Sequence, residues 1–275
     1  MLHVLDGDAT RAAFDAARIE GDVVVWGEAC MEGPWPRALR GLDDALARIR
    51  RAEAEGDEIV AWFDTDLFCR LNAACALSHA PRATWTNVVG THLRRQEMRA
   101  LFGVRAPMSP RLADVWRAYV GPDPRALLPF VDEFPWVKLH LSRFPSVKNG
   151  LDIVEERFLR QLRHDGPSGT GAIAARMRLG STFAPDQWGL TIEAAKRCVD
   201  ELGALIERGQ PHLQDHPHVE DWRAMIAISE RGRAVLEGER DRCDVVPLDR
   251  WVGGVHLEGH EPAWRWDGST LLHKP

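Results

Sequence analysis

Acidic residues follow the three N-terminal segments that have the pattern of buried strands. In an open parallel sheet, ligands bind outside the carboxyl ends of the strands, so carboxylates at these points can converge on one crevice. Such a group suits a hard divalent cation such as Mg²⁺, which takes one or two carboxylates together with the phosphates of a substrate. The residues concerned are Asp6, Asp8, Glu28, Glu32, Asp64 and Asp66.

Among these carboxylates, we expect Asp8, Asp66 and Glu32 to take part in catalysis. We expect Asp8, Glu28 and Asp66 to bind the metal ion. The alternative is structural, because an aspartate between a strand and a helix often accepts backbone N–H groups as an N-cap. Asp8 and Asp66 both stand at such a junction, and one residue can serve both roles.

Gly7 lies between Asp6 and Asp8 and would let the backbone approach an anion at a helix N-terminus. Gly7 and Asp6 are therefore candidates for contact with a phosphorylated cofactor or substrate. The flanking carboxylates would repel a phosphate unless a cation lies between them. The sequence contains neither Gly-x-Gly-x-x-Gly nor Gly-x-x-x-x-Gly-Lys-Ser/Thr, which disfavours nicotinamide cofactors and P-loop ATP hydrolysis.

Alternating strand and helix patterns position these residues and predict an α/β fold. We predict a Rossmann-like domain with a parallel sheet over residues 1–93, a helical connector over 94–149, and a winged-helix-like α+β part with a closing β-hairpin over 150–275. In the first domain the predicted strands cover 2–5, 22–26, 58–63 and 84–89, and the predicted helices 9–17, 39–55 and 67–77.

The later part of the chain has longer helical patterns. Helices are predicted over 152–164, 168–175 and 191–208, followed by a strand and a final helix within 225–236. This order resembles a winged helix-turn-helix. The last apolar segments, within 251–267, resemble one β-hairpin.

Composition limits the classes of function. The 275 residues are 45% hydrophobic and 28% charged, with no apolar run long enough to span a bilayer. The five cysteines show no Cys-x-x-Cys spacing and the N-terminus does not resemble a secretory signal, so we expect a cytoplasmic protein. The net charge of −6 does not favour nucleic acid as a partner, although a local basic patch remains compatible with it.

A cluster of three histidines and the single residue His256 have different interpretations. His212, His216 and His218 lie near Asp215, but the nearby prolines disfavour the helix that a metal site would need, so we expect a solvated loop. His256 stands beside Trp251 in a glycine-flanked strand, where we favour an intramolecular core contact over catalysis. If the C-terminal segment packs over the crevice, Arg250 and His256 become candidates for cofactor binding.

Several motifs together carry a resemblance to a known family. They are His3-Val-Leu-Asp-Gly-Asp8, Trp26-Gly-Glu28, Glu32-Gly-Pro34, Trp62-Phe-Asp-Thr-Asp66, Phe144-Pro-Ser-Val-Lys-Asn149 and Asp249-Arg-Trp-Val-Gly-Gly-Val-His256 with Trp264-Arg-Trp-Asp267. The chain resembles the bacterial family called domain of unknown function eighteen thirty-five. The resemblance implies architecture and no particular chemistry. Thr65 stands where relatives tend to carry histidine, and Cys69-Arg70 replaces a more usual acidic-polar pair.

These observations leave two hypotheses. The first is a ligand-binding protein or enzyme that holds a phosphorylated small molecule or nucleotide at the acidic strand ends, with a divalent cation. The second is a regulatory adaptor whose winged-helix-like part binds DNA or a protein. Clustered carboxylates at the strand ends would favour the first, and a continuous basic face on the C-terminal part would favour the second.

Overall fold

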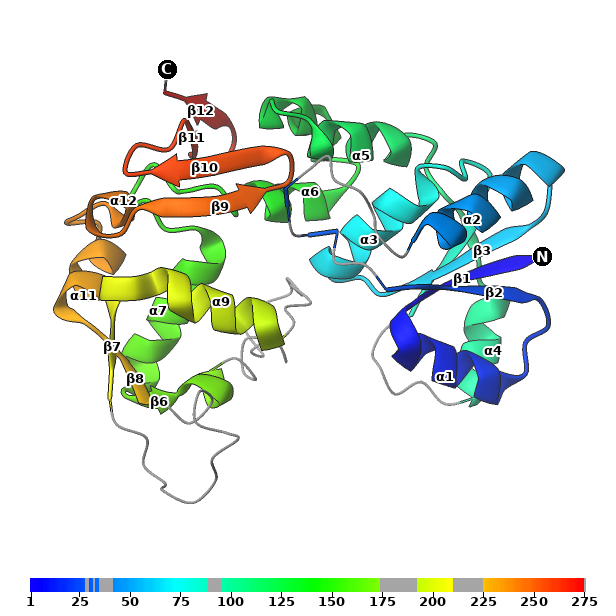
Figure 1. Cartoon of the computed structure of the whole chain (residues 1–275), viewed down its shortest axis with the longest axis horizontal. Coiled ribbons are helices and arrows are strands. Elements are labelled where there is room, and N and C mark those ends of the chain that lie inside the picture. The colour runs from blue at the N-terminus through cyan, green and yellow to red at the C-terminus, as the bar shows by residue number, and fades with distance from the viewer. Residues whose placement is uncertain are drawn as a thin grey trace. The chain divides into compact units, whose positions relative to one another are not determined.

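The computed structural model describes residues 1–27, 30–31, 33–34, 42–88, 95–173, 192–209 and 225–274. The chain divides into two compact units (Figure 1). Unit 1 contains Met1–Phe130 and Gly253–Val255, and unit 2 contains Val131–Val252 and His256–Pro275. The main division falls inside the segment predicted as a helical connector.

Unit 1 is built on a five-stranded sheet in the order β2-β1-β3-β4-β5. The first four strands are parallel, and the short β5 pairs antiparallel to β4 at one edge. Every residue of β3 is buried, as its unbroken apolar sequence predicts for a central strand covered on both faces. The strands are β1 (Leu2–Asp6), β2 (Asp22–Trp26), β3 (Ile59–Phe63), β4 (Thr84–Asn87) and β5 (Ala106–Pro107).

Helices cover both faces of this sheet (Figure 1). On one face α1 (Gly7–Ala17) packs against α4 (Arg95–Gly103), and on the other lie α2 (Asp43–Glu55) and α3 (Leu67–Leu77). Unit 1 closes with α5 (Leu112–Val120), which packs on α3, and the 3-10 helix η1 (Pro124–Phe130). The α/β class and the Rossmann-like parallel sheet predicted from the sequence are therefore confirmed.

His3, in the first motif of the chain, is part of this core. Its Nδ1 accepts a hydrogen bond from Trp62 Nε1 at 3.1 Å, and its Nε2 lies 3.0 Å from the carbonyl oxygen of Glu20. The imidazole also packs on the ring of Phe14 with centroids 4.7 Å apart. Burial lowers the pKa of His3, so the ring is neutral and serves as a structural group.

Unit 2 contains a helical part and a three-stranded antiparallel sheet in the order β6-β8-β7. Its core is apolar and gathers residues of α7, α9, α11 and this sheet, with Phe158 and Leu202 fully buried. The helices are α6 (Pro135–Leu141), α7 (Ile153–Asp165), α9 (Ile192–Leu202), the 3-10 turn η2 (Gly203–Leu205), α11 (Glu230–Glu237) and α12 (Arg242–Val245). The strands of the sheet are β6 (Ser168–Gly169), β7 (Ile206–Arg208) and β8 (Met225–Ile228).

Three sequence predictions for unit 2 need correction. The helix predicted over 191–208 ends at Leu202, because Gly203 adopts a φ of +48° and residues 206–208 then pair with β8. The helix predicted from 168 begins two residues later, because Ser168 and Gly169 form β6. The end of the chain forms two hairpins in place of one: β9 (Leu248–Val252) with β10 (Val255–Gly259), and β11 (Trp264–Trp266) with β12 (Leu271–His273).

Every helix that the structure describes is too short or too polar to span a lipid bilayer.

Candidate functional site

The order of the strands fixes where a ligand site is expected in unit 1. The chain leaves β1 toward β2 on one side and leaves β3 toward β4 on the other, although β1 and β3 are neighbours. The carboxyl ends of β1 and β3 therefore form the topological switch point, where open α/β sheets bind ligands. Asp6 is the last residue of β1, and Asp66 follows β3 at the start of α3.

Asp6 is a half-buried carboxyl group held by two residues of α3. The Cys69 thiol and the Asn72 amide both hydrogen-bond to it. Burial raises the pKa of Asp6 from 3.8 to about 6, and the negative charges of Asp66 and Asp64 add to this effect. Asp6 can therefore gain and lose a proton near neutral pH.

Asp66 caps α3, as one of the two sequence interpretations predicted. Its Oδ1 accepts a hydrogen bond from the backbone N–H of Cys69 at 2.7 Å. Burial raises the pKa of Asp66, and the nearby charge of Asp64 acts in the same direction. The cap fixes the orientation of a carboxylate that also faces Asp6, so capping and ligand binding are compatible here.

Cys69 lies between the two aspartates, and its single S–H is within hydrogen-bonding reach of either carboxylate. Burial and the adjacent carboxylates strongly raise the pKa of its thiol. Such a thiol remains protonated, and only a thiolate is an effective nucleophile. Cys69 therefore acts as a hydrogen-bond donor that separates Asp6 from Asp66.

Asn72 connects this group to the loop that follows β2. The Asn72 side chain is buried, and its Oδ1 accepts a hydrogen bond from the backbone N–H of Cys30 at 2.9 Å. The carbonyl oxygen of Cys30 in turn accepts a hydrogen bond of 2.8 Å from the hydroxyl of Tyr119. Helix α3, helix α5 and the loop that contains Cys30 therefore meet beside Asp6.

Arg70 brings a positive charge to the same end of the sheet. Its guanidinium carbon lies 4.1 Å from the ring centroid of Trp85, and its Nη2 donates to Asn87 Oδ1 at 3.0 Å. Its Nη1 is shielded from solvent and has no hydrogen-bond partner. Burial lowers the pKa of Arg70, while the charges of Asp64 and Asp66 partly offset this effect. Sequence reasoning did not select Arg70 as a site residue.

Gly7 and Asp8 lie in the first turn of α1, whereas Asp6 is the last residue of β1. Gly7 opens α1 with a φ of +77°, a conformation that favours glycine, and a Cβ there would meet no neighbour. The prediction that Asp8 caps this helix is wrong, because the helix begins at Gly7 and Asp8 lies exposed within its first turn. Asp6 is the residue of this motif whose carboxyl group interacts with the charge of Asp66.

The predicted metal site is only partly within the described residues. Glu28 and Glu32 lie outside them, as do His212, His216 and His218. Within the segments that the structure describes, no group of three or more His, Cys, Asp or Glu side chains has the arrangement of a metal site. Asp6 and Asp66 could supply two carboxylates, with phosphate oxygens and water completing a Mg²⁺ shell.

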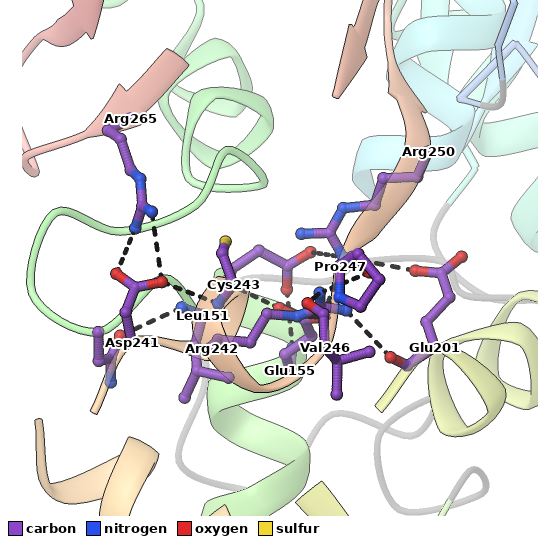
Figure 2. A network of polar contacts seen from close by, with 12 residues as sticks. Leu151, Glu155, Glu201, Asp241, Arg242, Cys243, Val246, Pro247, Arg250 and Arg265 are labelled. Atoms are coloured by element: carbon purple, nitrogen blue, oxygen red, sulfur yellow. Dashed lines mark hydrogen bonds and ion pairs between the residues drawn. The ribbon is translucent and has the colours of Figure 1, made fainter. Parts of the chain in front are cut away.

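Arg250, a predicted cofactor-binding residue, belongs to a network of buried charges in unit 2 (Figure 2). Its Nη1 lies 3.1 Å from Glu155, 3.2 Å from Asp152 and 3.4 Å from Glu201. Burial would lower the pKa of Arg250, but these three carboxylates raise it. Its Nε and Nη2 are shielded and have no hydrogen-bond partner.

Arg242 completes this network (Figure 2). Its side chain is 1% exposed and lies 3.0 Å from Glu155, while its other nitrogens donate to the carbonyl oxygens of Glu201, Val246 and Pro247. Burial alone would raise the pKa of Glu155, but Arg250 and Arg242 lower it. The network joins α7, α9, α12 and β9, which is a structural role.

His256, the other predicted cofactor-binding residue, is exposed on the β9–β10 hairpin. Its ring stacks on Trp251 with centroids 4.8 Å apart, and its Nε2 lies 2.8 Å from Asp249 Oδ1. These contacts are within the hairpin, but the ring is exposed, so the core contact predicted for His256 is wrong.

Comparisons with known proteins add little to this description. No family model and no curated protein matches the sequence. Among solved structures, the chain is similar to full-length topoisomerase I from Thermotoga maritima, with 10% identity and a TM-score of 0.34. The match covers 77% of this chain and 40% of the topoisomerase chain.

Proposed function

We propose that this protein binds or processes a phosphorylated small molecule or nucleotide at the carboxyl ends of β1 and β3, together with a divalent cation. The observation that carries the proposal is the pairing of Asp6 with Asp66 at the topological switch point, around the Cys69 thiol. Two partly buried carboxylates lower each other's tendency to ionise, and their destabilisation of the fold is relieved when a cation binds.

The two aspartates would have different roles. Asp66 is fixed by the backbone N–H of Cys69, so its second oxygen is suited to a cation that bridges to phosphate. Asp6 has a pKa of about 6, which suits a group that accepts or donates a proton near neutral pH. The proposed catalytic pair is therefore Asp6 and Asp66, with Asp8, Glu28 and Glu32 as further candidates from the sequence.

Thermal unfolding with added ligands tests this proposal. We expect Mg²⁺ or Mn²⁺ together with nucleotides or inorganic phosphate to raise the melting temperature of the wild type. The rise should be lost in Asp6→Asn and Asp66→Asn and kept in Asp15→Asn, which changes an exposed carboxylate of α1. The proposal fails if no ligand shifts the wild type, or if both site variants keep the full shift.

A second candidate function, a regulatory adaptor, is supported by the element order of unit 2. The order α7, β6, α9, β7, β8 with the antiparallel arrangement β6-β8-β7 is compatible with a winged helix. In such a fold α9 would be the recognition helix. The sequence of α9 contains two basic residues and three acidic ones, namely Lys196, Arg197, Glu193, Asp200 and Glu201. This negative balance favours a protein partner over DNA.

Fluorescence anisotropy with a labelled mixed-sequence duplex tests DNA binding by this part of the chain. We expect weak binding at 50 mM salt that disappears at 200 mM. Tight binding that falls in Lys196→Gln with Arg197→Gln would instead support DNA as the partner of α9.

A further inference from the structure

Arg70 has a free hydrogen-bonding position next to the proposed site. Its Nη2 is held by Asn87 Oδ1 and its guanidinium plane lies over Trp85, so the group is fixed in place. Its Nη1 is a buried donor with no partner. A buried guanidinium nitrogen without an acceptor is unfavourable, and an anionic oxygen that reaches it would supply the missing hydrogen bond.

The position of Arg70 links this donor to the aspartates. Arg70 is in the first turn of α3, next to Cys69, and its charge interacts with those of Asp64 and Asp66. Asn87 is the last residue of β4, so Arg70 lies at the strand end beside that of β3. Acidic side chains and a guanidinium with an unused donor are therefore neighbours at one end of the sheet.

We infer that Arg70 binds the phosphate of the ligand and that this ligand carries a terminal phosphate group, as in a phosphomonoester or nucleoside phosphate. The inference rests on the proposed function. One phosphate oxygen would accept from Arg70 Nη1, and the others would bind a cation held by Asp66 and Asp6. A terminal phosphate offers three non-bridging oxygens for these contacts, whereas a phosphodiester offers two and carries one charge less.

The local charge explains why phosphate would need both Arg70 and a bound Mg²⁺. The two negative charges of Asp64 and Asp66 outweigh the single positive charge of Arg70, so a phosphate dianion alone would be repelled. A bound Mg²⁺ reverses this balance. We therefore expect phosphate binding to require Mg²⁺ and to depend on Arg70.

Calorimetric titration of the full chain with inorganic phosphate and with dimethyl phosphate, each with and without Mg²⁺, tests the inference. We expect Mg²⁺-dependent binding of phosphate and none of dimethyl phosphate. Arg70→Gln should weaken phosphate binding on the order of 10- to 100-fold, the usual range for one charge-assisted hydrogen bond. Arg70→Lys should recover only part of this loss, because an ammonium does not reproduce the planar fork.

Arg105→Gln is the matched control. Arg105 also lies over an aromatic ring, 4.4 Å from the centroid of Phe102, but it is paired with Glu58. We expect its phosphate affinity to equal that of the wild type. Circular dichroism and thermal unfolding without ligand establish that each variant is folded.

The outcomes separate the inference from the function on which it rests. If phosphate binds the wild type and Asp66→Asn abolishes binding while folded Arg70→Gln and Arg70→Lys bind normally, the inference is wrong and the proposed site stands. Equal binding of dimethyl phosphate and phosphate also overturns the inference. If neither phosphate nor nucleotides bind the wild type, the proposed function itself fails.

Discussion

Replacing Asp6 by asparagine is expected to stabilise the fold at neutral pH. Burial raises the pKa of Asp6 from 3.8 to about 6, so the folded chain keeps a proton there that the unfolded chain releases. Stability is therefore lost as the pH rises from about 4 to 6, and the loss persists above pH 6. One pKa unit corresponds to about 1.4 kcal/mol, which makes about 3 kcal/mol an upper limit for this loss.

Asparagine removes the charge but keeps an oxygen that can accept from Cys69 and Asn72, and its amide can donate toward Asp66. Because Asp6 is partly exposed and its charge is coupled to that of Asp66, we expect a gain of about 1–3 kcal/mol in the free energy of unfolding at pH 7.5. At pH 4 or below, the variant and the wild type should have nearly equal stability.

Urea unfolding at pH 4, 5, 6 and 7.5 provides the measurement, with hydrogen exchange of peptides from β1 to assign the transition to unit 1. Asp15→Asn serves as a control, and we expect its difference from the wild type to be small at every pH. A variant that is less stable than the wild type at pH 7.5, or a gain that does not change with pH, would refute the reasoning about Asp6.

Three further predictions concern buried groups. Arg242→Met breaks the buried ion pair with Glu155 and should lower the free energy of unfolding by about 3–5 kcal/mol in urea denaturation. The control is Arg82→Met, whose exposed side chain pairs with Glu53 and whose loss should cost less than about 1 kcal/mol. Equal effects of the two substitutions would contradict this prediction. Because the Cys69 thiol stays protonated, iodoacetamide at pH 8 should leave it unlabelled in the folded chain and label it in urea. Mass spectrometry of the labelled peptides measures this difference. Ser229→Ala removes the N-cap of α11 and should lower the free energy of unfolding by about 1 kcal/mol, and an unchanged urea midpoint would argue against the cap.

Local sequence patterns predicted the elements of unit 1 well. The strand at 22–26 and the helix at 67–77 have the bounds predicted, because their apolar runs are continuous and Asp66 caps the helix. The helix predicted over 191–208 was too long, since the pairing of β7 with β8 is a contact between distant segments. Local periodicity does not record such a contact.

The candidate site could be predicted only in outline. The sequence indicated carboxylates at the strand ends, but the choice of Asp6 over Asp8 depends on where α1 begins, which a Gly7 with positive φ decides. Arg70 could not be selected because its contacts with Trp85 and Asn87 require β4 to lie beside β3. Strand order is a property of the whole sheet, and no single segment contains it.

The buried charges of unit 2 are compensated within the chain, whereas two neighbouring carboxylates of unit 1 are not. In unit 2, Arg242 donates to Glu155 and to three backbone carbonyl oxygens, so the buried ion pair is compensated within the chain. In unit 1, Asp6 and Asp66 face each other with a thiol between them, an arrangement that destabilises the ionised fold and that a bound cation would relieve.

Substitutions in the two groups should therefore have opposite signs at pH 7.5. Asp6→Asn should raise the free energy of unfolding of unit 1, and Arg242→Met should lower that of unit 2. Destabilisation by an intact active residue is the usual sign of a site retained for function at the expense of stability. If both substitutions destabilise the chain, Asp6 is a structural residue like Arg242, and the proposed site loses the observation on which it depends.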